Sequence, residues 1–195
     1  MSDTLEAPLA PAMTGAEQAL LRAAAAGAGA MLEFGCGGST AVLLDVGGRL
    51  LSVDSDAAWL ARVAATQSAA VAAGRLAQHH ADLGPVGEWG WPRRAPDALA
   101  GWAYWGAPWA AMAAPDFVLV EGRFRVACAL AAHGRLRPGG LLAVHDFWNR
   151  RVYQDGLAGF FEAVGSAGTM ALLSPRSVPA PLLKAARERF AVDAR

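Results

Sequence analysis

A glycine-rich bend and an acid at a fixed distance from it form the first group of residues in this chain with chemical potential. Residues 35–38 read Gly-Cys-Gly-Gly, and Asp54 lies nineteen positions after Gly35. Glycines allow a ligand to lie almost on the main chain. A carboxylate about 20 residues further on binds the ribose hydroxyls in nucleotide-binding βαβ units. The spacing therefore predicts a nucleotide-type cofactor site.

The second group combines an imidazole with carboxylates. Glu121 follows the apolar run 117–120, and His145 and Asp146 follow the apolar run 141–144. Histidine exchanges protons near neutral pH, so His145 is our first choice of general base, with Asp146 orienting it or acting by itself. The structural alternative is a turn whose side chains cap the next helix.

Regular elements must position both groups. Apolar residues 30–34 and 49–53 predict two strands covered on both faces, and residues 39–45 predict the helix between them. The bend then lies at the carboxyl end of the first strand, facing the amide groups of the helix. A plain strand-to-helix connection with glycines for capping is the alternative interpretation.

The string at residues 32–37, Leu-Glu-Phe-Gly-Cys-Gly, resembles the first motif of class I S-adenosylmethionine-dependent methyltransferases. In that family the strand-end acid supports the loop and the methionine end of the cofactor, and the acid after strand two holds the ribose. An acid after strand three often contacts the adenine. The resemblance thus implies the cofactor-binding residues Glu33, Gly35, Cys36, Gly37, Asp54 and Asp82. Asp82 is followed by Leu-Gly-Pro, which is also ordinary turn chemistry.

A second feature of the same family is Leu-Arg-Pro-Gly-Gly at 136–140 before an apolar strand. Ser39 stands where the family often has a third glycine. The resemblance implies an α/β fold, a Rossmann-like doubly wound, mostly parallel sheet of seven strands in the order 3-2-1-4-5-7-6, with strand 7 antiparallel and helices on both faces.

Methyl transfer from S-adenosylmethionine to a small molecule is the function that the resemblance implies, with oxygen as the acceptor atom because His145 and the carboxylates suit deprotonation. A nucleobase amino-group methylase is disfavoured by the absence of an Asn-Pro-Pro-Tyr-type motif. An NAD-dependent oxidoreductase is the first alternative, although the dinucleotide fingerprint expects glycine or alanine where Thr40 stands. A non-catalytic cofactor-binding protein of the same fold is the second.

A divalent metal is a further alternative. The chain loosely resembles catechol-type O-methyltransferases, in which acids after strands four and five hold the ion. The corresponding residues here are Glu121, His145 and Asp146. His79 and His80 are adjacent and face opposite sides of a strand, so we interpret them as structural. Arginines follow both strand ends, and they either bind an acidic acceptor or pair with carboxylates: Arg123, Arg125, Arg150 and Arg151.

Composition limits the partners. The chain has 195 residues, 54% hydrophobic content and a formal net charge of zero, which speaks against broad attraction to nucleic acid or to a membrane surface. A small-molecule substrate fits this charge balance, and the composition does not decide whether the chain forms a homodimer. Two cysteines form no disulfide framework, and no signal peptide is evident, so we expect a cytoplasmic protein. Residues 98–115 carry no charge, but their alanine, glycine and proline content disfavours a membrane span.

One methyltransferase-like domain is expected over 1–195, with a loose arm at 1–13. A capping box at Thr14 to Glu17 predicts a helix start. Further elements are expected as helices at 56–73, 124–136, 151–161 and 181–190, a strand at 75–81 and a hairpin at 162–174. Residues 84–114 hold five of the seven tryptophans. They predict a helix from Asp97 packed on the sheet by its aromatic side, or a cover that shapes the acceptor pocket.

Overall fold

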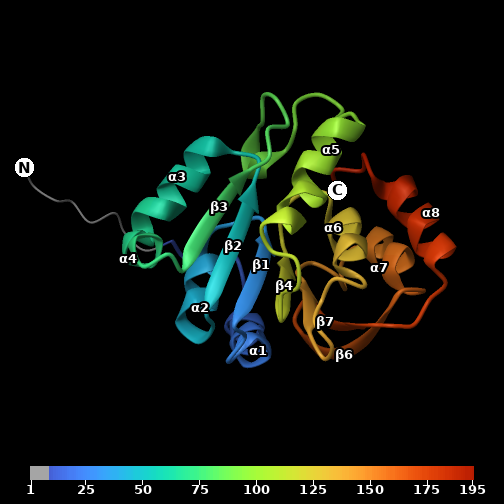
Figure 1. Ribbon diagram of the computed structural model, residues 1–195, viewed down its shortest axis with the longest axis horizontal. Coiled ribbons are helices and arrows are strands. Elements are labelled where there is room, and N and C mark those ends of the chain that lie inside the picture. Colours follow the sequence, from blue (N-terminus) through green and yellow to red (C-terminus); the bar gives the residue numbers. More distant parts are fainter. Residues whose placement is uncertain (1–8) are drawn as a thin grey trace, which may run out of the picture.

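The computed structural model describes residues 9–195, which form a seven-stranded sheet with helices on both faces (Figure 1). The strand order is β3-β2-β1-β4-β5-β7-β6, and β7 runs antiparallel to both of its neighbours. This confirms the predicted fold class and strand order. The strands are β1 Ala30–Phe34, β2 Arg49–Asp54, β3 Leu76–His80, β4 Phe117–Val120, β5 Leu141–Val144, β6 Phe161–Ala167 and β7 Met170–Pro175.

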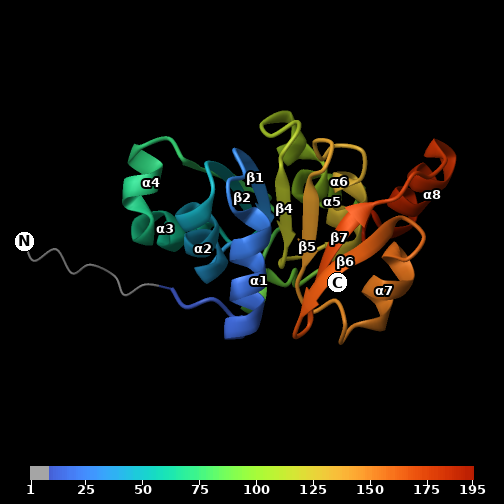
Figure 2. The same cartoon turned by 90° about the horizontal axis from the view of Figure 1, so that it is seen from below.

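Helices cover the sheet in two groups (Figures 1 and 2). The first group is α1 Gly15–Ala25, α2 Gly38–Val46 and α3 Ala57–Thr66, with α4 Ser68–Ala72 beside β3. The second group covers the opposite face with α5 Ala98–Trp105, α6 Arg125–Ala132, α7 Arg151–Leu157 and α8 Ala180–Phe190. Two short 3-10 helices, η1 Glu88–Gly90 and η2 Ala107–Ala110, flank α5.

Each central strand is buried on both faces because its side chains alternate between two hydrophobic clusters. In β4, Phe117 and Leu119 pack in the cluster that holds α1 and α2. Val118 and Val120 pack in the larger cluster with α5, α6 and α7. In β1, Met31 belongs to the first cluster, so Glu33, two residues on, points toward α2 from the same face.

Three expected helices are shorter than predicted. The helix expected over 56–73 divides at Gln67, whose backbone leaves the helical region, into α3 and α4. The helix expected over 124–136 ends at Ala132, because His133 is extended and Gly134 has a φ of +77°. The helix expected over 151–161 ends at Leu157, and its last expected residue, Phe161, already belongs to β6.

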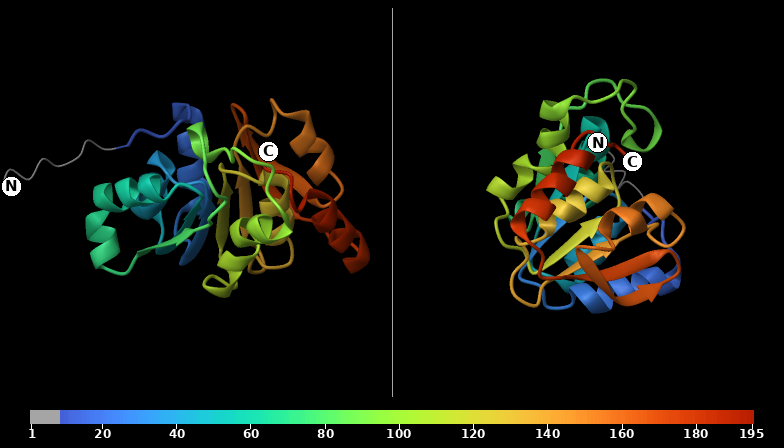
Figure 3. Two further views of the ribbon diagram at one scale, coloured as in Figure 1. Left: turned by 90° about the horizontal axis from the view of Figure 1, so that it is seen from above. Right: turned by 90° about the vertical axis from the view of Figure 1, so that its right-hand side faces the viewer.

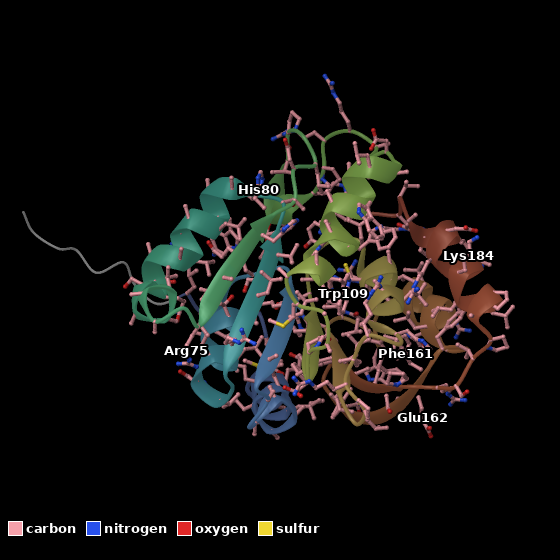
Figure 4. All side chains as sticks on the ribbon, viewed as in Figure 1. Arg75, His80, Trp109, Phe161, Glu162 and Lys184 are labelled. Carbon is pink, nitrogen blue, oxygen red and sulfur yellow. The ribbon has the colours of Figure 1, made fainter. Side chains whose placement is uncertain are left out.

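The tryptophan-rich segment divides into a hairpin and a helix. Val86 and Pro92 form a bridge, and residues 84–92, here called the covering hairpin, enclose η1. Asp97 caps α5 by accepting from the amide of Ala100, which confirms the helix predicted from this residue. Aromatic side chains of α5 and η2 are buried in the larger cluster, as the packing interpretation expects: Tyr104, Trp105 and Trp109. Trp109 is labelled in Figure 4.

β3 is anchored at both ends, and Figure 4 shows Arg75 and His80 at its opposite ends. The Arg75 guanidinium donates to the carbonyls of Leu44 and Gly47, which are left unpaired where α2 ends. His80 contacts the carbonyl of Ser55 through Nε2 at 3.2 Å, and His79 contacts the carbonyl of Ala103 at 3.0 Å. Both histidines therefore bond the main chain, in line with their structural interpretation.

Among the described residues, no helix has the length and apolar character that crossing a bilayer requires. Within the uncharged stretch 98–115, α5 has only eight residues.

α1 begins with the predicted capping box and is tied to the β6–β7 turn by the same side chain. Glu17 Oε2 accepts from the amide and the hydroxyl of Thr14 at 2.7 and 2.8 Å. Its Oε1 accepts from the amide and the hydroxyl of Thr169, both at 2.8 Å. Figure 3 shows α1 beside this hairpin. Burial raises the pKa of Glu17, but the bonds from Thr14 and Thr169 outweigh it and lower the pKa to about 2.

Glu17→Gln should lower the free energy of unfolding near neutral pH by up to about 3 kcal/mol. A carboxyl group whose pKa is lower in the folded state than in the unfolded state stabilises the fold at pH values above the unfolded-state pKa. That contribution is lost as the pH falls from 4.5 toward about 2, so the variant and the wild type should converge in acid. Urea unfolding at about pH 7 and about pH 3 measures both values. Glu162→Gln, at an exposed position of β6, is the control. An equal difference at both pH values would contradict the assignment.

Candidate functional site

The glycine bend lies where the carboxyl ends of β1 and β4 meet. Gly35 has a φ of +90°, and its amide donates to the carbonyl of Val53 at 2.7 Å. A Cβ on Gly35 would lie 2.4 Å from the amide nitrogen of Gly122. The two main chains therefore touch, and any side chain at position 35 is excluded by both conformation and contact.

Glu33 holds the bend from beneath. Its carboxylate is fully buried and accepts from the hydroxyls of Ser39, Thr40 and Ser52 at 2.6, 2.8 and 2.7 Å. Ser39 and Thr40 lie in the first turn of α2, and Ser52 lies opposite Glu33 in β2. Burial raises the pKa of Glu33 to about 7, although the three hydroxyls act in the opposite direction.

Asp54 points into the bend, as a ribose-binding carboxylate requires. Its Oδ2 accepts from the amide of Cys36 at 3.2 Å, and its Oδ1 accepts from the amides of Ser55 and Asp56 at 2.7 and 3.0 Å. Burial raises the pKa of Asp54, and the three amides oppose that effect. The thiol of Cys36 is buried, which raises its pKa and leaves it unreactive near neutral pH.

The covering hairpin lies over Asp54. Ser55 Oγ donates to the carbonyl of Gly90 at 2.9 Å, and a Cβ on Gly90 would lie 3.4 Å from Asp54 Oδ1. Trp89 at its tip has a φ of 59° and is 81% exposed. The helix α5 thus packs on the sheet as predicted, and the hairpin lies over Asp54. That this segment shapes an acceptor pocket stays a prediction.

Trp59 of α3 and the N-terminal residue Pro11 also pack against the glycine bend. Trp59 Nε1 donates to the carbonyl of Cys36 at 2.7 Å. A Cβ on Gly38 would lie 2.2 Å from the nitrogen of Pro11. The expected loose arm at 1–13 is therefore wrong for residues 9–13, because Pro11 lies against Gly38 and Met13 is buried. The rest of that prediction, residues 1–8, lies outside the described residues.

Asp82 is exposed at the end of β3, and its Oδ1 accepts from the amide of Gly84 at 2.8 Å. The turn chemistry expected for this position is therefore present. Contact with an adenine stays a prediction.

The three predicted catalytic groups do not all converge. His145 is buried, with Nδ1 3.4 Å from Glu121 Oε1 and Nε2 3.6 Å from Glu17 Oε1. Burial lowers the pKa of His145, but the hydrogen bond with Glu121 and the nearby carboxylates outweigh it and raise the pKa above 6.5. The carboxylates on both sides stabilise the imidazolium.

Asp146 points away from the imidazole toward arginines. Its Oδ2 lies 3.2 Å from Arg125 and 3.4 Å from Arg150, and its Oδ1 accepts from Asn149. Arg125 also donates to the carbonyl of His145 at 2.7 Å. Burial raises the pKa of Asp146, but Arg125 and His145 outweigh it and lower the pKa. The Asp146 side chain thus holds Arg125 under the His145 main chain, and its role in catalysis stays a prediction.

Among residues 9–195, no group of three or more histidine, cysteine, aspartate or glutamate side chains is arranged to hold a metal ion. Glu121 and His145 are adjacent, whereas the Asp146 carboxylate is engaged by Arg125 and Arg150. The metal alternative therefore lacks support from this geometry.

The structure adds site residues that the sequence analysis missed. Ser52 completes the Glu33 cluster, and Tyr104 accepts from the amide of Arg123 at 3.1 Å beside Gly122. Only the register of Ser52 opposite Glu33 offered a signal in the sequence, because both side chains lie on one face of adjacent strands. Nothing in the sequence separated Tyr104 from the other aromatic residues of its segment.

The fold and this edge of the sheet define a class: an α/β protein of the class I methyltransferase type, with a carboxylate facing a glycine bend. No protein-family model and no curated protein matches the sequence. Among solved structures, a methyltransferase-like protein from Silicibacter pomeroyi is 34% identical and matches with a TM-score of 0.78, covering 95% of this chain and 98% of that one. This chain therefore belongs to the class I methyltransferase-like proteins.

More distant structures share the fold alone. The O-methyltransferase TomG from Streptomyces achromogenes, in complex with SAM, is 19% identical with a TM-score of 0.58, covering 85% of this chain and 82% of its own. The N-methyltransferase NodS from Bradyrhizobium japonicum, in complex with S-adenosyl-L-homocysteine, is 13% identical with a TM-score of 0.54, covering 83% and 85%.

Glu33→Gln should flatten the pH dependence of stability. The pKa of Glu33 is raised from 4.5 to about 7. The protonated side chain therefore contributes fully to stability below pH 4.5, and this contribution is lost as the pH rises through about 7. The loss amounts to about 3 kcal/mol. Urea unfolding from about pH 4.5 to about pH 8 measures it in the wild type and in the variant. Asp45→Asn, at an exposed position of α2, should keep the wild-type slope. A Gln variant with that same slope would contradict the prediction.

Proposed function

We propose that this protein transfers a methyl group from S-adenosylmethionine to an oxygen atom of a small molecule. The observation that carries the proposal is the orientation of Asp54, whose carboxylate meets the amide of Cys36 inside the bend at 3.2 Å. A carboxylate in this place can accept from both hydroxyls of a ribose. Membership in the methyltransferase-like family, and the cofactor complexes of TomG and NodS, support the same cofactor.

The residues present fit that cofactor. Asp54 would hold the ribose, the main chain of Gly35 to Gly37 would lie beneath it, and Glu33 would hold the bend through its hydroxyl partners. Asp82 is the proposed adenine-side residue. When bound, the cofactor supplies an electrophilic methyl group on a sulfonium. Because Gly90 lies over Asp54, the covering hairpin must shift to admit it.

On the acceptor side, His145 and Glu121 act as a pair. His145 would take the proton of the acceptor hydroxyl, and Glu121, 3.4 Å from Nδ1, would stabilise the imidazolium that forms. Arg125 and Asp146 fix the main chain of His145. Since the pKa of His145 is raised, its neutral form becomes available only at higher pH.

The dinucleotide alternative fits this geometry less well. The fingerprint requires a small residue at the position of Thr40 for close packing. Here the Thr40 hydroxyl donates to Glu33 at 2.8 Å and accepts from the amide of Gly37 at 3.1 Å. The side chain therefore belongs to the support of the bend.

A cofactor-binding protein without turnover is the second candidate. One observation favours it: both ring nitrogens of His145 face carboxylates. Binding and turnover are therefore tested separately.

Asp54→Asn should weaken the binding of S-adenosylhomocysteine by about 10-fold to 100-fold, because the neutral amide loses charge-assisted bonds to the ribose worth about 1.5 to 3 kcal/mol. Isothermal calorimetry measures both affinities, with NAD as the competing ligand. Asp155→Asn, at an exposed position of α7, is the control. Equal affinity in Asp54→Asn and the control, or binding of NAD alone, would refute the cofactor assignment.

Glu121→Gln should lower the pKa of His145, because it removes the carboxylate that stabilises the imidazolium. NMR titration of the ring protons measures the pKa in the wild type, where it should exceed 6.5, and in the variant. Comparison with His145→Ala assigns the resonance. Glu188→Gln, on the exposed surface of α8, should leave the titration unchanged. An unshifted midpoint in Glu121→Gln would show that the pair does not function as described.

A further inference from the structure

Two arginines, Arg123 and Arg125, follow the end of β4. Among the described residues, Arg125 pairs with a carboxylate, whereas Arg123 does not. It follows Glu121 and Gly122, and its own amide donates to the Tyr104 hydroxyl at 3.1 Å. Its guanidinium lies over the indole of Trp91, with 4.5 Å between Cζ and the ring centroid. Its Nε is buried without a hydrogen-bond partner in residues 9–195.

The neighbouring arginines differ in this respect. Asp146 accepts from Arg125 and Arg150, and Arg151 lies 2.8 Å from Asp155. The carboxylates near the site are likewise engaged: Asp54 by main-chain amides, Glu121 by His145 and Glu17 by two threonines. The local arrangement therefore leaves Arg123 with an unmatched positive charge.

An unmatched guanidinium at a partly buried position destabilises a fold, because desolvation of the charge is not offset by a partner. Burial and the nearby Arg125 lower the pKa of Arg123, which shows the same cost. Planar guanidinium groups bind carboxylates through two parallel N–H bonds, and a stacked indole holds the plane in place. A carboxylate ligand would pair the charge of the guanidinium.

The position of Arg123 links it to the proposed site. Gly122 touches Gly35 of the bend, because a Cβ on Gly122 would lie 2.7 Å from the Gly35 Cα. Trp91 is the neighbour of Gly90, which covers Asp54. Arg123 thus lies between the glycine bend and the covering hairpin, on the α5 side of the sheet.

We propose that Arg123 binds a carboxylate of the methyl acceptor, and that the substrate is therefore a hydroxy acid held between Arg123 and the covering hairpin. This inference rests on the proposed function. The amino acid portion of the cofactor carries a carboxylate too, so the experiment distinguishes the two sources.

The acceptor arm uses 4-hydroxybenzoate and its neutral analogue 4-hydroxybenzyl alcohol as probes, titrated by calorimetry with and without S-adenosylhomocysteine. Wild type should bind the acid at least about 10-fold more tightly than the alcohol. Arg123→Met should abolish this preference, and Arg123→Lys should keep part of it. Arg151→Met removes a nearby exposed charge and should keep all of it. A wild type without preference, or a preference that survives Arg123→Met, would overturn the proposal.

The cofactor arm compares S-adenosylhomocysteine with 5′-methylthioadenosine, which lacks the amino acid portion. Arg123→Met should leave both affinities unchanged. A loss confined to S-adenosylhomocysteine would assign Arg123 to the cofactor carboxylate and overturn the acceptor role. If wild type binds neither nucleoside, the proposed function fails. The ratio of the affinities for 4-hydroxybenzoate and 4-hydroxybenzyl alcohol, measured without nucleoside, still decides the inference.

Stability provides a readout independent of any ligand. Because Arg123→Met removes an unmatched charge and keeps an apolar contact with Trp91, its melting temperature should rise by about 2 to 4 °C. A structural arginine would behave in the opposite way. A lowered melting temperature together with weaker binding of all probes would show that Arg123 supports the fold, and would overturn the proposal.

Discussion

The buried carboxylate of Glu33 is the constraint on which the site depends. It joins three elements, because Ser52 comes from β2, Ser39 and Thr40 come from α2, and Glu33 itself lies in β1. A buried carboxylate without partners would be strongly destabilising, so the three hydroxyls and the α2 N-terminus have to stay in place. The glycine bend between β1 and α2 is therefore held from below, and Asp54 meets it from the adjacent strand.

Contacts between main chains set the shape of the same edge. Gly35 and Gly122 touch, so β1 and β4 approach more closely at their carboxyl ends than side chains would allow. After β4 and β5, two side chains lie toward opposite faces of the sheet. His145 lies toward α1, where Glu17 faces it, whereas Arg123 lies toward α5, against Tyr104 and Trp91. The site thus has an acid–base side and a cationic side, separated by the end of β4.

The covering hairpin connects Asp54 with the cationic side of the site. It is held by Val86, which packs against the larger cluster, by the hydrogen bond from Ser55 to Gly90 and by the stacking of Arg123 on Trp91. Segments with few buried apolar contacts open at low free energy. Trp89, at positive φ and largely exposed, also stores backbone strain at the tip. A segment of this kind can move without disturbing the sheet beneath it.

The sequence alone determined most strands and the framework of the glycine bend, because apolar runs, glycines and capping residues act over short distances along the chain. The strand order followed from the family resemblance. The strands, the α1 capping box and the Asp97 start of α5 followed from such local patterns. Helix ends were less predictable. Gln67 leaves the helical region without any strong breaker at its position, and α6 ends before Gly134, ahead of the Pro138-Gly139-Gly140 run that was expected to end it. Only the tertiary structure decided the partners of the charged groups. Asp146 pairs with Arg125, His145 lies between two carboxylates and Arg123 lacks one, and these pairings join residues from different strands and helices whose distances no local pattern records.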